Sequence, residues 1–451
     1  MDFERIKALL ADKNFSLLQE ELINMQAADV AEFLEDLEVK IALLVFRLLH
    51  KEMATDVFSY LSHDRQSELL MLVNEKEFTE IIDDLYFDDK IDLLEEMPAY
   101  VVKKILRNAS ETERRLINQF LNYPDNSAGS LMTIEFVDLK KEMLVKDALD
   151  RIRKIALDKE TIYTCYAINA HRVLEGIVSL KDLVLAPLDK KVADVMQKEV
   201  IFVNTYDDQE YIADIVKKYD LLSVPVVDNE QRLVGIITID DIVDVIEEEN
   251  TEDFHRMAAL EPMEEEYLSA SIFGLARKRI VWMMVLMLSA TLTSFIIQKY
   301  NVALSAVISL AAYIPMLTGT GGNAGAQAST LSIRSIALGE VGFKDIFKVI
   351  WTEMRVSFLV GITLAIINFL RILFLEPALQ DNTFSIAITV SATMLITVMI
   401  AKMIGGTLPI LAKQLKLDPA IMATPVISTI VDALTLLVYF TFATWIFGIA
   451  S

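Results

Sequence analysis

The sequence predicts a multidomain membrane protein with an all-α superhelical N-domain, an α/β middle part and a transmembrane domain of five helices. The division of charge along the chain is the first observation behind this prediction. Residues 271–451 carry 12 Lys and Arg against 7 Asp and Glu, whereas residues 1–270 carry 30 against 58. The acidic part is expected to be soluble, and the other part to lie in a bilayer in contact with lipid. So acidic a surface repels phosphate, which argues against a nucleic-acid partner.

Residues 1–124 predict an acidic domain of short amphipathic helices. Apolar residues recur there at spacings of three and four, as in Val30, Phe33, Leu34 and Leu37. The first glycine of the chain is Gly129, so residues that break helices are rare before it. A helical superhelix follows from this pattern.

Two similar segments, residues 173–183 and 233–243, predict a repeated strand, turn and helix. A buried strand, residues 223–228, precedes the second one. These segments resemble a tandem pair of cystathionine-β-synthase (CBS) domains, with the first expected over residues 125–188 and the second over residues 189–248.

Such CBS pairs commonly bind adenine nucleotides through a Ser or Thr and an Asp in each motif. On that resemblance the nucleotide-binding candidates are Ser179, Asp182, Thr238 and Asp241. The alternative is that each Ser/Thr–Asp pair only caps the helix that follows it.

Five long stretches with few or no charges predict membrane spans, because about 20 apolar residues cross a bilayer. They are residues 280–298, 300–333, 349–375, 382–401 and 420–449. The transmembrane domain is therefore expected over residues 277–451.

Basic residues in the short loops predict the orientation of these spans. They precede the first span and separate spans two and three, and spans four and five: Arg277, Lys278, Arg279, Arg334, Lys344, Lys348, Lys413 and Lys416. No signal peptide is expected, because the first residues lack a basic segment followed by an apolar stretch. We therefore expect a multi-pass protein with a cytoplasmic N-terminus and an outside C-terminus.

Asp432 is the single charged residue between Pro419 and Ser451. A carboxylate at that depth costs roughly 2.5–3.5 kcal/mol, so it is expected to face a partner or a water-filled path. At 100° per residue, one 80° arc of the helix carries five polar side chains. They are Thr424, Thr435, Ser428, Tyr439 and Asp432. The alternative is a neutral acid, or one paired with a lysine such as Lys402.

A glycine-rich stretch, residues 315–327, is expected to have an irregular backbone at membrane depth. Such backbone is tolerated only inside protein or beside a cavity. The alternative is close helix packing through small residues. The stretch holds no proper G-x-G-x-x-G after a strand, so a dinucleotide site is excluded.

An acidic connector, expected over residues 249–276, precedes the first span. Nine acids occur close together in this region: Glu247, Glu248, Glu249, Glu252, Asp253, Glu261, Glu264, Glu265 and Glu266. They could form a merely solvated helix face. Because like charges repel until cations bridge them, their position instead predicts a switch that responds to divalent ions.

The order of these parts, with residues 315–327 and the segment 418–432, closely resembles the MgtE family of magnesium channels and transporters. The resemblance implies a homodimer in the plasma membrane (the bacterial inner membrane) that imports Mg²⁺ into the cytosol. It also implies closure of the pore by intracellular Mg²⁺, with ATP as a candidate regulatory ligand of the CBS domains.

The resemblance implies site residues of two kinds. Asp432, Ser428 and Thr424 would bind the metal in the pore, with Asn323, Gln327 and Thr435 lining it. The cytosolic Mg²⁺ sensor would consist of Asp89, Asp228, Glu249, Glu252, Asp253 and Glu261. Thr424 and Thr435 depart from the Asn and Gly frequent in the family, which leaves selectivity for Mg²⁺ over Co²⁺, Ni²⁺ or Mn²⁺ open.

The sequence leaves one other class of protein open and argues against another. An ion-coupled secondary transporter of divalent cations (Mg²⁺ or Co²⁺), or an exporter, would use Asp432 as a proton or Na⁺ site, and this alternative stays open. An enzyme is not expected, because the four histidines are dispersed and no H-E-x-x-H, P-loop or C-x-x-C motif occurs.

Overall fold

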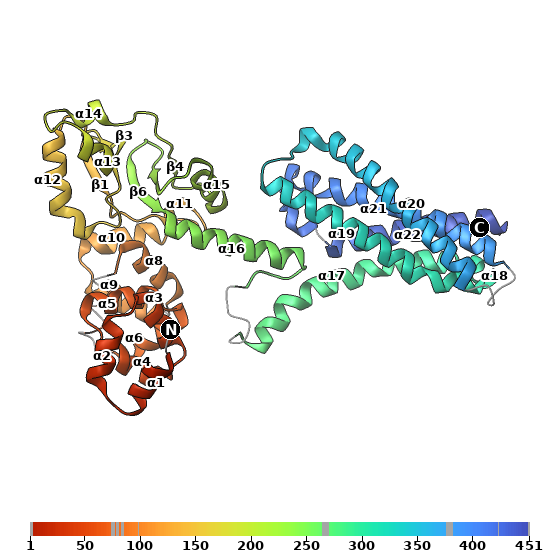
Figure 1. Cartoon of the computed structure of the whole chain (residues 1–451), viewed down its shortest axis with the longest axis horizontal. Helices are drawn as coiled ribbons and strands as arrows, with labels where there is room; N and C mark the ends of the chain where they lie inside the picture. Colours follow the sequence, from red (N-terminus) through yellow and green to blue (C-terminus); the bar gives the residue numbers. More distant parts are fainter. Residues whose placement is uncertain are drawn as a thin grey trace. The chain divides into compact units, whose positions relative to one another are not determined.

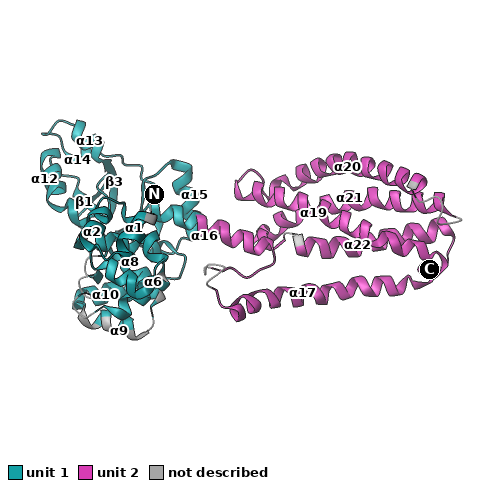
Figure 2. Cartoon of the chain, turned by 60° about the horizontal axis from the view of Figure 1, so that its bottom comes forward, with its two compact units in different colours: residues 1–246 teal, residues 247–451 magenta. Residues whose placement is uncertain are grey.

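The computed structural model describes residues 3–73, 77, 81–82, 85–97, 99–263, 270–375, 382–422 and 424–449. The chain forms two compact units, residues 1–246 and residues 247–451 (Figure 2). The multidomain prediction of helical, α/β and membrane-helical parts is confirmed (Figure 1).

Short helices make up the N-terminal part of the first unit. They are α1 (Phe3–Ala11), α2 (Phe15–Ile23), α3 (Ala27–Glu35), α4 (Val39–Phe46), α5 (Lys51–Ser59), α6 (His63–Leu72), α8 (Phe87–Glu96), α9 (Ala99–Asn108) and α10 (Glu111–Phe120). The side chains of Asn14, Ser62 and Ser110 cap three of them by accepting a backbone N–H three residues later.

The helical part and the second CBS domain share one hydrophobic core within the first unit. Aromatic rings continue across the junction in edge-on contacts, from Phe87 to Phe120 and on through Tyr123 to Tyr206. Gly129 allows this packing, because a Cβ there would lie 2.4 Å from the Tyr123 ring.

The two CBS domains contain sheets of the same topology. The first has the order β1 (Val137–Lys140), β2 (Thr164–Ile168), β3 (Leu174–Ser179), and the second β4 (Val203–Asn204), β5 (Ser223–Val227), β6 (Leu233–Thr238). In each sheet the first pair is parallel and the second antiparallel. The register also repeats, with an irregularity after Ala167 in one sheet and after Val226 in the other.

Helices flank these sheets, and α13 and α16 follow the two repeated segments as the motif predicts. They are α11 (Ala128–Leu131), α12 (Val145–Ile155), η1 (Ala156–Asp158), α13 (Leu180–Leu185), α14 (Val192–Val195), α15 (Gln209–Tyr219) and α16 (Ile239–Met257). The acidic connector begins inside α16, which runs without a break from the second CBS motif to Met257.

The second unit is a bundle of long helices that run side by side (Figures 1 and 2). Its elements are α17 (Ile272–Lys299), α18 (Asn301–Ala306), η2 (Ile308–Tyr313), α19 (Ile314–Ala337), η3 (Phe343–Asp345), α20 (Ile346–Leu375), α21 (Thr383–Gln414), η4 (Pro419–Met422) and α22 (Thr424–Phe447). Four described helical segments are long and apolar enough to cross a membrane, and the more polar α19 is the fifth long helix of the bundle.

The irregular backbone expected at residues 315–327 is wrong. This stretch lies inside the continuous helix α19, and the non-α backbone precedes it in η2. Pro315 fits because it occupies the first turn of α19, where its missing N–H costs nothing. The glycines instead allow close packing: a Cβ on Gly405 would lie 2.2 Å from the carbonyl oxygen of Gly325.

Candidate functional site

The polar arc of α22 divides into a buried part and a partly exposed part. Tyr439 is fully buried and its hydroxyl donates to the carbonyl oxygen of Leu310 at 2.9 Å. Ser428 and Asp432 keep partial exposure in the single chain. The side chain of Thr424 lies outside the described residues. A helical wheel cannot show this division, because it does not say which edge of the arc meets a neighbouring helix.

Thr435 faces the helix interface, and in the single chain it does not line an open surface. It is 2% exposed, and its hydroxyl lies close to the position that a Cβ on Gly321 would occupy. The hydroxyls of Thr435 and Thr397 are both buried without a hydrogen-bond partner in the described part of the chain. The absent side chain of Gly321 lets α22 approach α19 at this point, which buries Thr435.

The predicted polar residues of α19 lie on an exposed face. Asn323 and Gln327 are one turn apart and both exposed. Ser428 of α22 is adjacent, since its hydroxyl lies 3.0 Å from where a Cβ on Gly322 would be. α19 and α22 therefore pack together beside Ser428, and Asn323 directly follows Gly322 in α19.

Lys402 does not pair with Asp432. Its ammonium donates to Oε1 of Gln327 at 3.4 Å, so the alternative of an Asp432–Lys402 ion pair is not supported. Within the described residues Asp432 has no ion pair.

A cluster of carboxylates surrounds Asp89 within the first unit. We call it the N–CBS acidic cluster, and its members interact electrostatically: Asp88, Asp89, Glu135, Glu160, Asp240 and Asp241. Ser59 donates to Oδ2 of Asp89 at 3.0 Å, and the backbone N–H of Glu160 donates to the carbonyl oxygen of Glu135 at 2.9 Å.

Burial and mutual repulsion raise the pKa values in this cluster. Burial, followed by the charges of Asp240 and Asp241, raises the pKa of Glu160 to about 8. Burial raises the pKa of Asp241 to about 6, and that of Asp88 well above its usual range. Oδ1 of Asp88 and Oε2 of Glu160 are buried without a hydrogen-bond partner in the described part. A cation bound nearby would therefore stabilise the ionised form of these carboxylates.

Sequence reasoning found Asp89 but missed most of its neighbours. The doublets Asp88-Asp89 and Asp240-Asp241 are visible in the sequence, yet nothing there places them together. Glu135 and Glu160 carry no local signal, because the fold alone brings them to Asp89.

The Ser/Thr and Asp of each nucleotide candidate pair contact one another at the start of the helix that follows them. The Ser179 hydroxyl donates to Oδ2 of Asp182 at 2.7 Å and accepts the Asp182 N–H at 3.0 Å. Thr238 likewise donates to Oδ2 of Asp241 at 2.7 Å.

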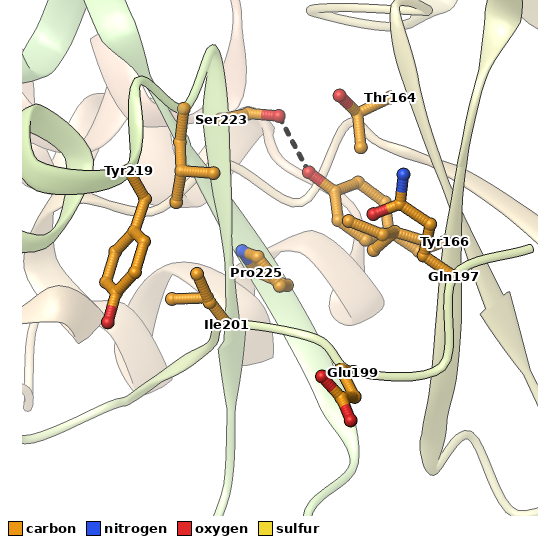
Figure 3. Close-up of a pocket in the computed structure, with 10 residues that line it drawn as sticks. Thr164, Tyr166, Gln197, Glu199, Ile201, Tyr219, Ser223 and Pro225 are labelled. Carbon is orange, nitrogen blue, oxygen red and sulfur yellow. Dashed lines mark hydrogen bonds between the residues drawn. The ribbon is translucent and has the colours of Figure 1, made fainter.

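A pocket of about 230 Å³ lies between the two CBS sheets (Figure 3). Its lining comes from β2, β3, β5 and the segments before β4 and β5: Thr164, Tyr166, Ile177, Gln197, Glu199, Ile201, Tyr219, Leu221, Ser223 and Pro225. The hydroxyls of Tyr166 and Ser223 hydrogen-bond at 2.8 Å inside it. The four predicted nucleotide-binding residues are not among those that line it.

The end of α16 carries a second acidic group, in the second unit. Arg256 forms ion pairs with Glu252 and with Asp418, which precedes η4. Burial raises the pKa of Asp253 to about 6, followed by the charges of Asp418 and Glu249. The end of α16 is thus linked to the loop before α22.

The remaining predicted sensor residues lie apart from these two groups. Oδ1 of Asp228 accepts the backbone N–H groups of Glu230 and Arg232 and so forms the turn between β5 and β6. The Glu261 N–H donates to the carbonyl oxygen of Lys278 at 3.4 Å. Glu264, Glu265 and Glu266 lie outside the described residues. Across the described residues, no three His, Cys, Asp or Glu converge closely enough to coordinate a metal ion directly.

Comparison with protein families defines the class. The family model for the divalent cation transporter MgtE matches residues 314–442, that for the MgtE intracellular N domain residues 25–126, and that for the CBS domain residues 192–248. The chain is therefore a multi-pass membrane protein of the divalent cation transporter class.

Relatives along the whole chain identify the family. The magnesium transporter MgtE of Thermus thermophilus is 34% identical over 97% of both chains, and that of Bacillus subtilis is 31% identical over 98% of this chain and 96% of the relative. The chain belongs to the MgtE family of magnesium transporters.

Two solved structures each resemble about half of the chain. The cytosolic domain of the Mg²⁺ channel MgtE in complex with ATP matches with a TM-score of 0.51 and 34% identity, covering 53% of this chain and 98% of that one. The soluble part of a magnesium transporter matches with a TM-score of 0.51 and 30% identity, over 55% and 97%.

Proposed function

We propose that the protein is a homodimeric Mg²⁺ channel of the plasma membrane that imports Mg²⁺ and is closed by cytosolic Mg²⁺. The observation that carries the proposal is the partly exposed segment of Ser428 and Asp432 on α22, which packs against α19, the helix that exposes Asn323 and Gln327. Facing lipid, a carboxylate there would cost several kcal/mol, so this face requires water, an ion or another protein chain.

A second copy of the chain would supply the other wall of the path. Mg²⁺ keeps several waters and is bound by one or two carboxylates. Two Asp432 side chains, one from each copy, match that requirement. The polar amides and Ser428 would then contact the water shell of the ion.

Replacement of Asp432 tests the path. Asp432→Asn keeps the shape of the side chain and removes its charge, so we expect Mg²⁺ uptake to fall at least tenfold in cells that lack other importers. Thr441→Val is the matched control, because Thr441 is exposed on the same helix and its hydroxyl donates only to the carbonyl oxygen of Leu437 among described groups. Full uptake by Asp432→Asn would contradict the proposed path.

The coupling of transport to another ion can be tested by recording Mg²⁺ currents. A channel carries current down a Mg²⁺ gradient without a proton or Na⁺ gradient. A strict requirement for either coupling ion would contradict the channel and favour a secondary transporter.

For the closed state we propose that hydrated Mg²⁺ binds at the N–CBS acidic cluster and at the acids near the end of α16. The raised pKa values of Glu160 and Asp253 support this, because burial and neighbouring carboxylates disfavour their ionised forms, a cost that a bound cation would offset. When Mg²⁺ is scarce, repulsion between these acids favours their separation and an open path. Glu249, Glu252, Asp89, Asp228 and Glu261 remain proposed members of the sensor.

We further propose that an adenine nucleotide binds in the pocket between the CBS sheets as a regulator. The apolar side chains of Ile177, Ile201 and Leu221 and the ring of Tyr166 suit a planar base. Ile201→Trp would fill the pocket, so ATP should raise the melting temperature of the wild-type protein but not of this variant. An equal rise in both would place ATP elsewhere.

A further inference from the structure

Lys402 is a buried cation at membrane depth. It is 6% exposed in the middle of α21, its ammonium contacts Oε1 of Gln327 at 3.4 Å, and its charge acts on Glu353 of α20. Gly406, one turn further along α21, packs against Glu353: a Cβ there would lie 3.0 Å from its Cγ. Three neighbouring helices thus share one polar layer.

This layer lies at a similar depth to Asp432. The last residues of α19 and α21 and the first residues of α20 and α22 are at the same end of the bundle, because short loops join them. With a rise of 1.5 Å per residue, four residues lie about 11–18 Å from that end. They are Gln327, Glu353, Lys402 and Asp432. Gln327 therefore links the buried lysine to the exposed face of α19.

The contact fixes the orientation of the Gln327 amide. A lysine ammonium has donors and no acceptor, so the atom facing it must be the amide oxygen. The NH₂ group is then left to the exposed face that Gln327 shares with Asn323.

The orientation matters for a hydrated cation. The waters around Mg²⁺ direct their hydrogens outward, so the groups that hold the hydrated ion best are acceptors. An oxygen already bound to an ammonium is a poor acceptor for those waters. Conduction needs binding weak enough for the ion to leave.

We propose that Lys402 is a positioning residue that weakens ion binding near Asp432 by withholding the Gln327 carbonyl oxygen from the hydrated ion. The proposal rests on the ion path proposed for α19 and α22. It assigns the lysine a role in setting how tightly the transported divalent cation is held.

Lys402→Met removes the charge and keeps the length of the side chain. The freed Gln327 oxygen can then accept from the hydrated ion, so KM for Mg²⁺ uptake should fall about fivefold, the effect of roughly one added hydrogen bond. The maximal rate of uptake per folded molecule should not rise, because a more tightly bound ion dissociates more slowly. Lys402→Arg keeps a donor for Gln327 and should retain the wild-type KM. An unchanged or raised KM in Lys402→Met would overturn the proposal.

A double-mutant cycle separates this role from a purely structural one. In the Gln327→Met background no amide oxygen exists, so adding Lys402→Met should leave KM unchanged. An equal fall in both backgrounds would overturn the proposal.

Lys402→Leu takes the place of Lys402→Met if that variant does not fold. It also removes the donor to Gln327, so KM should fall severalfold in the same way. An unchanged or raised KM in Lys402→Leu would overturn the proposal. Failure of the path itself would appear separately, as full uptake by Asp432→Asn.

Discussion

The surroundings of Glu160 show how burial and neighbouring acids favour the binding of a cation. Its carboxyl is partly buried, one of its oxygens has no hydrogen-bond partner in the described part, and Asp240, Asp241 and Asp89 act on it. Nothing in the sequence around Glu160 separates it from the many surface acids of this chain. Only the folded chain gives it a pKa of about 8.

This shift predicts a pH dependence of stability. The pKa of Glu160 is raised above its unfolded value, so the folded state binds the proton more tightly than the unfolded state does. Its contribution is full at low pH and is lost as pH rises from about 4.5 to about 8. With a chelator present, the protection factors of the α8 amides, which are corrected for the base-catalysed intrinsic exchange rate, should therefore be lower at pH 8 than at pH 6.

Glu160→Gln should reduce that difference, because glutamine stays neutral across this range. Millimolar Mg²⁺ at pH 8 should restore protection in the wild type more than in Glu160→Gln. The exposed Asp150→Asn serves as the control, since its partner Arg153 lies on the surface. Protection that rises with pH in the wild type would contradict the assignment.

At the scale of elements, α16 combines two roles in one helix. Its first turn follows the second CBS sheet, and its last turns carry Asp253 and Arg256 close to Asp418. The charge pattern of residues 247–266 predicted a region of repulsion, but it could not reveal that Arg256 already pairs with one of these acids, Glu252, and with Asp418. The Arg256 guanidinium and a bound Mg²⁺ would compete for the same carboxylates.

Neutralising the acids of this helix should therefore relieve inhibition by internal Mg²⁺. For Glu252→Gln/Asp253→Asn we expect the half-inhibitory internal Mg²⁺ concentration to rise about tenfold or more, because two of the charges that attract the ion are gone. Patch-clamp recording with varied Mg²⁺ on the cytosolic side measures this. Glu142→Gln, outside α16, should behave as the wild type, and unchanged inhibition in the double variant would remove these acids from the sensor.

At the scale of the whole molecule, charge-free stretches predicted the membrane part and a repeated motif predicted the CBS pair. The pattern and composition of the sequence suffice to predict these features, because each depends on residues that are close together in the sequence. Contacts between distant segments were not predictable in this way. The glycine run was expected to be irregular, since its role becomes clear only when Gly325 is seen against Gly405. Thr435 and Ser428 share a polar arc, yet one is buried and the other is not.

The proposed orientation predicts labelling from one side of the membrane. In a Cys165→Ala background, Ser451→Cys should react with an impermeant maleimide in intact cells, because the C-terminus is expected outside. Gly342→Cys, in the loop between α19 and α20, should react only after the cells are permeabilised. The reverse pattern would contradict the orientation. Cys165 itself is buried, so its replacement removes background without exposing a surface.

The contact between Gly325 and Gly405 also limits which parts of the bundle can move. Helices slide past one another only where side chains can exchange neighbours, and here backbone lies directly against backbone. α19 and α21 therefore behave as a fixed frame for any opening or closing. Movement is left to the more loosely held elements, above all α17, whose most apolar stretch has no residue buried inside the bundle.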